Sequence, residues 1–128
     1  MHKTYLTVRG YELDSYGHVN NAVYLQYLEQ ARWEIMKEMN LLDYLSDQEL
    51  LMVVIETRIR YIREACLFDE LVVETDIQPG SPFVIFRQRI RNQKSGLLVS
   101  RASVKTILID THKMARDLPE EIQRMNQD

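Results

Sequence analysis

Cysteine, glycine and proline are scarce in this sequence, and long apolar runs are missing. The only cysteine, Cys66, cannot form an internal disulfide, which fits a reducing compartment such as the cytoplasm. No apolar run approaches the ~20 residues that cross a bilayer, and residues 1–5 lack the apolar stretch of a secretory signal. We therefore expect a cytoplasmic protein that does not insert into membranes.

Common motifs of cofactor and metal chemistry are also missing. The sequence contains no glycine-rich phosphate loop, no Gly-x-Ser-x-Gly elbow and no His-Glu-x-x-His pair. His18 has no second histidine, cysteine or carboxylate at ligand spacing, so a metal site is not expected. No repeat, low-complexity segment or Pro/Gly-rich linker divides the chain, and residues 1–128 are predicted to form one domain without a cofactor.

The charge balance hides a basic stretch inside an acidic chain. A net charge of −3 argues against general nucleic-acid binding. The basic residues concentrate where strands are expected, and could hold an anionic small molecule or simply line a solvated strand face. They are Arg58, Arg60, Arg63, Arg87, Arg89, Arg91, Lys94, Arg101 and Lys105.

One long amphipathic helix is predicted after the Asn20-Asn21 pair. Its apolar residues recur at spacings of four, three, four and four, which gives a single buried face about five turns long. Either asparagine could cap the first turn by accepting from its free N–H groups. The apolar positions are Tyr24, Leu28, Ala31, Ile35 and Met39.

Strands are predicted on both sides of this helix. Residues 5–9 form a short first strand, and alternating or continuous apolar patterns predict strands at 51–61, 71–77, 84–90 and 97–110. A short helix begins near Pro119. Tight turns between successive strands require an antiparallel sheet, so we expect an α+β fold, an antiparallel sheet wrapped around one long central helix. Sheet edges could pair between subunits.

The loop between the first strand and the helix has the strongest chemical signal. Gly17 permits a tight turn that folds the Asp14 carboxylate back toward the helix N-terminus, where unpaired N–H groups could polarise a carbonyl. Asp14 could then attack that carbonyl or activate water. Alternatively, Asp14 only caps the loop. His18 could be a general base, a ligand orienter or a packed residue, and Cys66 is expected to be partly buried and structural.

A resemblance to a known protein family favours one of these alternatives. The string Leu13-Asp14-Ser15-Tyr16-Gly17-His18-Val19-Asn20-Asn21-Ala22-Val23-Tyr24-Leu25, followed by Glu29-Gln30-Ala31-Arg32-Trp33, resembles the 4-hydroxybenzoyl-CoA thioesterase branch of the hotdog superfamily. Within that branch it is most similar to the bacterial long-chain acyl-CoA thioesterases. The expected order of elements matches the hotdog fold over essentially the whole chain.

The resemblance implies an acyl-CoA thioesterase acting on medium- to long-chain substrates, assembled as a homodimer or homotetramer with active sites between subunits. Asp14 would be the catalytic nucleophile or general base, with His18 as a possible helper. The backbone N–H of Asn21 would polarise the thioester carbonyl. Substrate-binding positions would be Gly17, Tyr24 and Leu28 near the acyl chain, unless the last two are only core residues, and Arg60, Arg63 and Arg89 near the phosphates of coenzyme A.

The sequence departs from these relatives in one loop. Glu64 stands where relatives usually carry proline, and Phe68 stands near a usual glycine. Because that loop often borders the substrate mouth, chain-length preference is left open. Two other functions remain in competition: an acyl-thioester hydratase of the same fold, although no His-x-x-x-x-Pro-Gly pattern follows His18, and a non-catalytic acyl-CoA binding module, although no segment is left for a DNA-binding domain.

Overall fold

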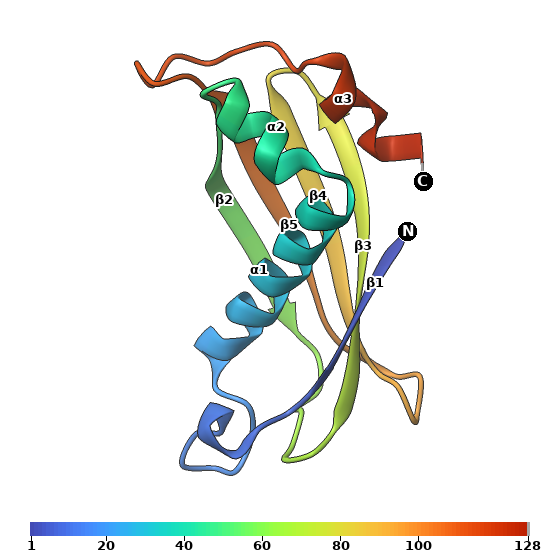
Figure 1. Cartoon of the computed structure of the whole chain (residues 1–128). Helices are drawn as coiled ribbons and strands as arrows, with labels where there is room; N and C mark the ends of the chain where they lie inside the picture. Colours follow the sequence, from blue (N-terminus) through green and yellow to red (C-terminus); the bar gives the residue numbers. More distant parts are fainter. Residues whose placement is uncertain (128) are drawn as a thin grey trace.

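The computed structural model describes residues 1–127 and shows one sheet with a long helix across one of its faces (Figure 1). Antiparallel strands follow in the order β1-β3-β4-β5-β2, so β1 and β2 are the two edges. The elements are β1 (His2–Thr7), the 3-10 turn η1 (Gly10–Glu12), α1 (Asn21–Glu38), α2 (Leu41–Asp47), β2 (Leu51–Tyr61), β3 (Glu70–Gly80), β4 (Phe83–Asn92), β5 (Leu98–Ile109), α3 (Glu120–Gln123) and η2 (Arg124–Gln127). The expected α+β arrangement is confirmed.

Helix α1 forms as its apolar spacing predicts. Of the two candidate caps, Asn20 is the N-cap, and its Oδ1 accepts from the N–H of Ala22 at 2.9 Å. Eighteen residues give five turns. Four of the five predicted stripe residues are buried; the fifth, Met39, is the C-cap and only partly buried. The helix therefore covers the sheet with one face and leaves the other to solvent.

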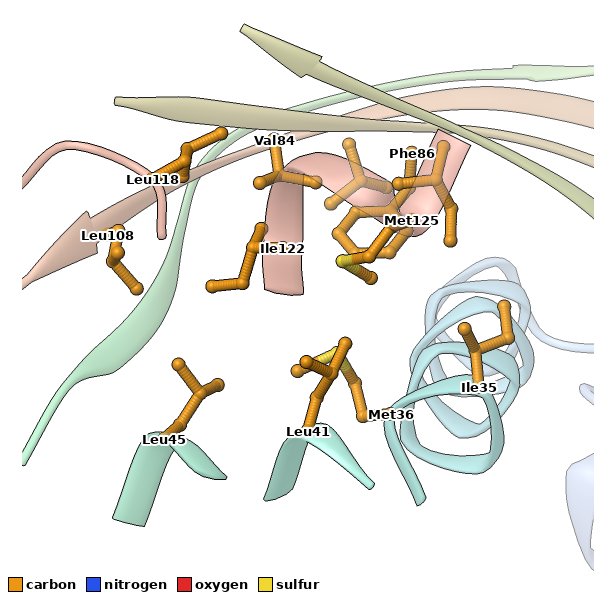
Figure 2. Packing of buried hydrophobic residues seen from close by; sticks show 12 residues of the cluster. Ile35, Met36, Leu41, Leu45, Val84, Phe86, Leu108, Leu118, Ile122 and Met125 are labelled. Atoms are coloured by element: carbon orange, nitrogen blue, oxygen red, sulfur yellow. The ribbon is translucent and has the colours of Figure 1, made fainter. Parts of the chain in front are cut away.

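The core has two parts along the length of α1. Near the start of the helix, Tyr24, Leu28 and Ala31 pack with Leu71 and Ile90 of the sheet. Near its end, a second cluster combines α1, α2, the strands and the C-terminal segment (Figure 2). Figure 2 shows side chains of α1, α2, the sheet and the C-terminal segment packed together: Ile35, Met36, Leu41, Leu45, Val84, Phe86, Leu108, Leu118, Ile122 and Met125.

Two predictions about elements need correction. The first strand was placed at residues 5–9, but β1 runs from His2 to Thr7, because the chain turns away after Thr7 and the Val8 N–H donates to the Asp69 carbonyl. The helix α2 was not predicted at all. Its seven residues are too few for a periodic signal, yet Leu41 and Leu45, one turn apart, are both buried.

Within residues 1–127, no helix is both long and apolar enough to cross a membrane.

Candidate functional site

The loop that carries Asp14 is a tight, hydrogen-bonded turn. The N–H of Asp14 donates to the His18 carbonyl at 2.8 Å, and the N–H of Gly17 donates to the Asp14 carbonyl at 3.1 Å. Gly17 has φ +82°, a left-handed conformation that side chains disfavour. The Oδ1 atom of Asp14 accepts from the N–H groups of Tyr16 (2.9 Å) and His18 (3.3 Å). The Oδ1 atom of Asp14 therefore caps the loop, which is one of the two roles predicted for this residue.

The second carboxylate oxygen of Asp14 is in a different situation. No donor within hydrogen-bonding distance of Oδ2 is found in the described residues 1–127. The carboxylate is only partly buried, so this oxygen remains accessible. Capping therefore uses one oxygen and fixes the orientation of the group, and the other oxygen is left for a ligand.

The first N–H groups of α1 are not equivalent. The Ala22 N–H donates to the Asn20 side chain, and the Val23 N–H donates to the Asn20 carbonyl at 2.9 Å. The N–H of Asn21 finds no acceptor in the part of the chain that the structure describes. It stands at the positive end of an 18-residue helix dipole, where an N–H without an intrahelical partner attracts a partial negative charge.

A hollow of about 220 Å³ brings most of the predicted site residues together. It joins the loop, the start of α1 and the segment that follows β2. Its lining residues are Asp14, His18, Val19, Asn21, Tyr24, Tyr61, Ile62, Arg63 and Glu64. We call this the polar pocket. The structure thus places Asp14, Asn21, His18, Tyr24 and Arg63 around one space.

The walls of the polar pocket are held by aromatic hydroxyls. Tyr61 donates its hydroxyl proton to the Asn21 carbonyl at 2.9 Å, and the Ala65 N–H donates to the Tyr24 hydroxyl at 3.1 Å. Burial raises the pKa of Tyr24 above its ordinary value, so the phenol stays neutral at physiological pH. Its ring stands edge-on to Tyr61, with centroids 5.3 Å apart. These contacts tie the strand β2 and the 62–66 segment to the helix start.

His18 and Arg63 flank the pocket with polar groups. The Nε2 atom of His18 lies 4.0 Å from Oε1 of Glu64. Glu64 is one of the two residues at which this loop differs from relatives. Arg63 donates through Nη1 to the Leu98 carbonyl at 2.7 Å and otherwise faces solvent. Both residues can therefore approach a ligand that enters from outside.

Four predicted binding residues do not line the polar pocket, and one of them is Gly17, which lies in the turn of the Asp14 loop. Leu28 is fully buried in the core cluster near the helix start. Arg60 and Arg89 lie on the face of the sheet opposite α1, because Gln88 contacts α1 and neighbouring strand positions alternate. There they border a hollow of about 520 Å³ with Arg58, Arg87 and Arg101. Arg89 is paired with Glu74 and Asp76 at 3.3 and 3.0 Å.

A buried carboxylate that sequence reasoning missed anchors the loop. Glu12 accepts from the Arg9 N–H and the Tyr27 hydroxyl, both at 2.8 Å, and from Arg9 Nη2 at 2.9 Å. Its own carbonyl accepts from the Asn20 N–H. Burial alone would raise the pKa of Glu12, but these hydrogen bonds outweigh it and hold the pKa below its ordinary value. The Arg9–Glu12 spacing, with Tyr27 beside the helix stripe, was the available signal.

A second hollow lies at the other end of α1. It has a volume of about 450 Å³ and is lined mainly by apolar side chains of α1, α2 and the first half of β2. We call it the apolar cavity. Its lining residues are Glu29, Arg32, Trp33, Met36, Leu42, Leu45, Ser46, Leu50, Leu51, Met52, Val54, Phe86 and Thr106. Only Glu29 and Arg32 among them are charged, so the cavity suits a hydrocarbon chain with one polar contact.

The edge strand β2 connects the two hollows. Its Tyr61 end borders the polar pocket, and its Leu51 end borders the apolar cavity. Along this edge Leu51, Val54 and Ile55 are about half exposed, although they are strongly apolar. An exposed apolar edge strand offers unpaired N–H and C=O groups to another chain.

Two other possibilities were considered for the site. Cys66 is a free, partly buried cysteine, as expected, and burial raises the pKa of its thiol, which disfavours the nucleophilic thiolate. Across residues 1–127, no group of three or more histidine, cysteine or carboxylate side chains could hold a metal ion.

Known proteins resemble the chain over nearly its full length. A family model described as the thioesterase-like superfamily matches residues 8–125. The long-chain acyl-CoA thioesterase FadM of Escherichia coli is 35% identical over 109 residues, which cover 84% of this chain and 83% of FadM. The acyl-CoA thioesterase YbgC of Haemophilus influenzae is 34% identical over 106 residues, 80% of this chain and 76% of YbgC. The crystal structure of YbaW, a probable thioesterase from Escherichia coli, has a TM-score of 0.88 at 33% identity, and the match covers 96% of this chain and 94% of that one.

Proposed function

The chain belongs to the thioesterase-like superfamily, and on that premise we propose that it hydrolyses medium- to long-chain acyl-CoA to the free acid and coenzyme A. Its fold is the hotdog fold, and its family is that of acyl-CoA thioesterases, which are thioester hydrolases. The long-chain substrate named for FadM supports the proposed chain length. A cytoplasmic location stays a prediction.

One observation carries the proposal. Asn21, whose N–H has no acceptor in residues 1–127, and Asp14, whose Oδ2 has no donor there, both line the polar pocket. A thioester carbonyl oxygen that accepts from this N–H is polarised, and the developing negative charge is stabilised by the helix dipole. A donor of this kind is typically worth about 3–4 kcal/mol of transition-state stabilisation. Tyr61 donates to the carbonyl of Asn21, in the next peptide unit, and so helps to hold the start of α1 in place.

Asp14 supplies the oxygen chemistry by one of two routes. As a nucleophile, Oδ2 attacks the carbonyl carbon, the C–S bond breaks, coenzyme A leaves as thiolate, and water hydrolyses the resulting anhydride. As a general base, Asp14 removes a proton from water, which attacks the carbonyl directly. Both routes need the same orientation of the carboxylate, which the two loop hydrogen bonds to Oδ1 provide. Thiolate is a good leaving group, so no strong general acid is required.

Two residues at the pocket rim complete the proposed site. Arg63 is proposed to meet a phosphate of coenzyme A; in support, it lines the polar pocket and its side chain is exposed to solvent. His18 stands near Glu64 at the same rim and is proposed to assist proton movement. The positions of Arg60 and Arg89 across the sheet make them weaker candidates for the same role.

We also propose that two chains pair through β2. Antiparallel pairing of two β2 edges about a twofold axis places the Tyr61 end of one strand beside the Leu51 end of the other. The polar pocket of one subunit then lies next to the apolar cavity of its partner. The thioester would sit in the first and the acyl chain in the second. Such dimers could pair further into tetramers.

Thiol release from a panel of acyl-CoAs tests the function. We expect release from medium- and long-chain substrates, with smaller rates for short and aromatic acyl groups, because the apolar cavity has a volume of about 450 Å³ and a mainly apolar lining. Tight acyl-CoA binding without any release would support the binding-module alternative. Conversion of an enoyl-CoA to a hydroxyacyl-CoA without release would support the hydratase alternative.

A further inference from the structure

Arg32 places a positive charge in the wall of the apolar cavity. It lies on the sheet-facing side of α1, partly buried, where its Nη1–H donates to Gln88 Oε1 at 3.1 Å. No carboxylate comes within 4.0 Å of it in the described residues; Glu29, one turn earlier on α1, lines the same cavity and acts on Arg32 electrostatically, but its side chain is exposed. Burial lowers the pKa of Arg32 from its ordinary value, but a guanidinium remains charged at physiological pH.

Gln88 satisfies only part of this guanidinium. The Gln88 amide is fixed from its other side, since Nε2 donates to the Leu28 carbonyl and to Thr75 Oγ1, both at 3.1 Å. Its oxygen is therefore directed at Arg32 and accepts one of the five N–H bonds that a guanidinium offers. The remaining N–H groups have no acceptor in residues 1–127.

The cavity wall around Arg32 is otherwise largely apolar, so a purely hydrocarbon ligand would leave its unpaired N–H groups without acceptors. Trp33, Met36 and Phe86 line the same cavity, and so do Leu42, Leu45, Leu50 and Met52. A plain acyl chain in this space would remove water from the guanidinium and offer no hydrogen bond in return, which costs free energy. An oxygen acceptor on the ligand would restore those bonds, and a carboxylate could do so with two parallel bonds.

We propose that Arg32 selects acyl chains that carry a distal oxygen acceptor, a carboxylate before a hydroxyl, over plain hydrocarbon chains of the same length. The inference rests on the proposed function for the identity of the acyl-CoA. It adds a specificity-determining contact at the end of the chain, far from the reacting carbonyl. Arg32 touches the distal part of the substrate and takes no part in the bond-breaking step.

Binding is measured first, because it does not depend on hydrolysis. Trp33 is the only tryptophan in the sequence and lines the cavity, so its fluorescence reports occupancy. The Asp14→Asn variant is titrated with a saturated acyl-CoA and with its ω-hydroxy and ω-carboxy counterparts, at several chain lengths. At the length that reaches Arg32, we expect the ω-carboxy compound to bind about tenfold more tightly or better.

Variants of Arg32 then separate recognition from structure. Arg32→Met fills similar volume without charge, and we expect the ω-carboxy preference in both binding and kcat/KM to vanish; saturated acyl-CoA should bind this variant more tightly, because no guanidinium is then desolvated. Arg32→Lys keeps a cation and is expected to restore part of the preference. A general loss of folding in Arg32→Met, seen by thermal unfolding, would leave the wild-type panel and Arg32→Lys to decide.

Two outcomes overturn the proposal and are distinguishable from failure of the proposed function. Hydrolysis of saturated acyl-CoA with no preference for ω-oxygenated chains at any length removes the inference and leaves the thioesterase. An equal preference in wild type and Arg32→Met removes Arg32 as its source. If no acyl-CoA is hydrolysed, the thioesterase fails, and the fluorescence titration still accepts or rejects the role of Arg32.

Discussion

The two ends of α1 border hollows that differ in size and in the groups that shape them. At the N-terminal end, the polar pocket is small, of about 220 Å³, and is shaped by backbone hydrogen bonds that hold one carboxylate and one free N–H. At the other end, the apolar cavity is twice as large, of about 450 Å³, and is shaped by side chains of two helices and three strands. In the proposed function, the first end holds the reacting group and the second holds the substrate tail.

In the proposed function, this difference corresponds to two tasks: positioning of the thioester carbonyl and selection of the acyl chain. A carbonyl has to be placed accurately against Asp14, so that end is built from a short loop with hydrogen bonds at 2.8–3.3 Å. Chain selection tolerates adjustable side chains such as Met36 and Met52, which fill irregular space. Substitutions at the two ends should therefore change different kinetic quantities.

The largest expected effect is at the polar end. Asp14→Asn keeps an Oδ1 atom for the Tyr16 and His18 N–H groups, so the loop should stay folded, but the side chain loses its charge and its basicity. We expect kcat to fall by about 10²–10⁴-fold with unchanged thermal stability and unchanged binding of acyl-CoA. Turnover close to that of the wild type would exclude Asp14 from the chemistry.

The anchor of the polar end predicts a pH-dependent stability. Because the pKa of Glu12 is lowered on folding, its carboxylate stabilises the fold above the ordinary pKa of 4.5 and ceases to do so as the pH falls through the lowered value. Glu12→Gln should lower the free energy of unfolding at neutral pH by about 1–3 kcal/mol. Denaturant titrations should show this deficit shrinking below pH 4.5. A deficit that does not change with pH would contradict the role assigned to the charge.

The arginines give a smaller and more selective effect. Arg63→Ala should raise KM for acyl-CoA by about tenfold, the value of one charge-assisted hydrogen bond, and leave KM for acyl-pantetheine, which lacks the nucleotide, unchanged. Arg89→Ala is the matched control, because its side chain lies across the sheet and is paired with Glu74 and Asp76. Equal effects of both variants would show that the nucleotide reaches the other face.

The smallest effect concerns the loop that borders the polar pocket. Phe68 has φ +66° and is 74% exposed, so it adopts a left-handed conformation and has little packing to lose. Phe68→Gly should raise the free energy of unfolding by up to about 1 kcal/mol, because glycine tolerates this conformation. Thermal unfolding measures the change. A loss of stability would show that the exposed ring makes a contact, such as one in an oligomer.

The two ends of α1 also differ in how much of their structure could be predicted from the sequence. Residues 14–24 lie close together in the chain, so the loop, the Asn20 cap and the helix stripe follow from local patterns. The apolar cavity joins positions from Glu29 to Thr106, and no periodicity brings those together. Glu12 and Tyr61 act through hydrogen bonds to Tyr27 and Asn21, contacts that depend on how β1 and β2 meet the helix. Arg60 and Arg89 were grouped with Arg63 because composition alone does not assign strand faces.

The central claim is that the two ends work across a pair of subunits, and a mixing experiment tests it most directly. Asp14→Asn disables the polar pocket, and Leu42→Trp is chosen to fill the apolar cavity. Each variant alone should be inactive on long-chain acyl-CoA. If subunits exchange freely, half of the dimers in an equal mixture are mixed, and each has one complete site, so about a quarter of wild-type activity should return. A mixture as inactive as its two components, with subunit exchange verified, would show that each chain uses its own cavity and would contradict the claim.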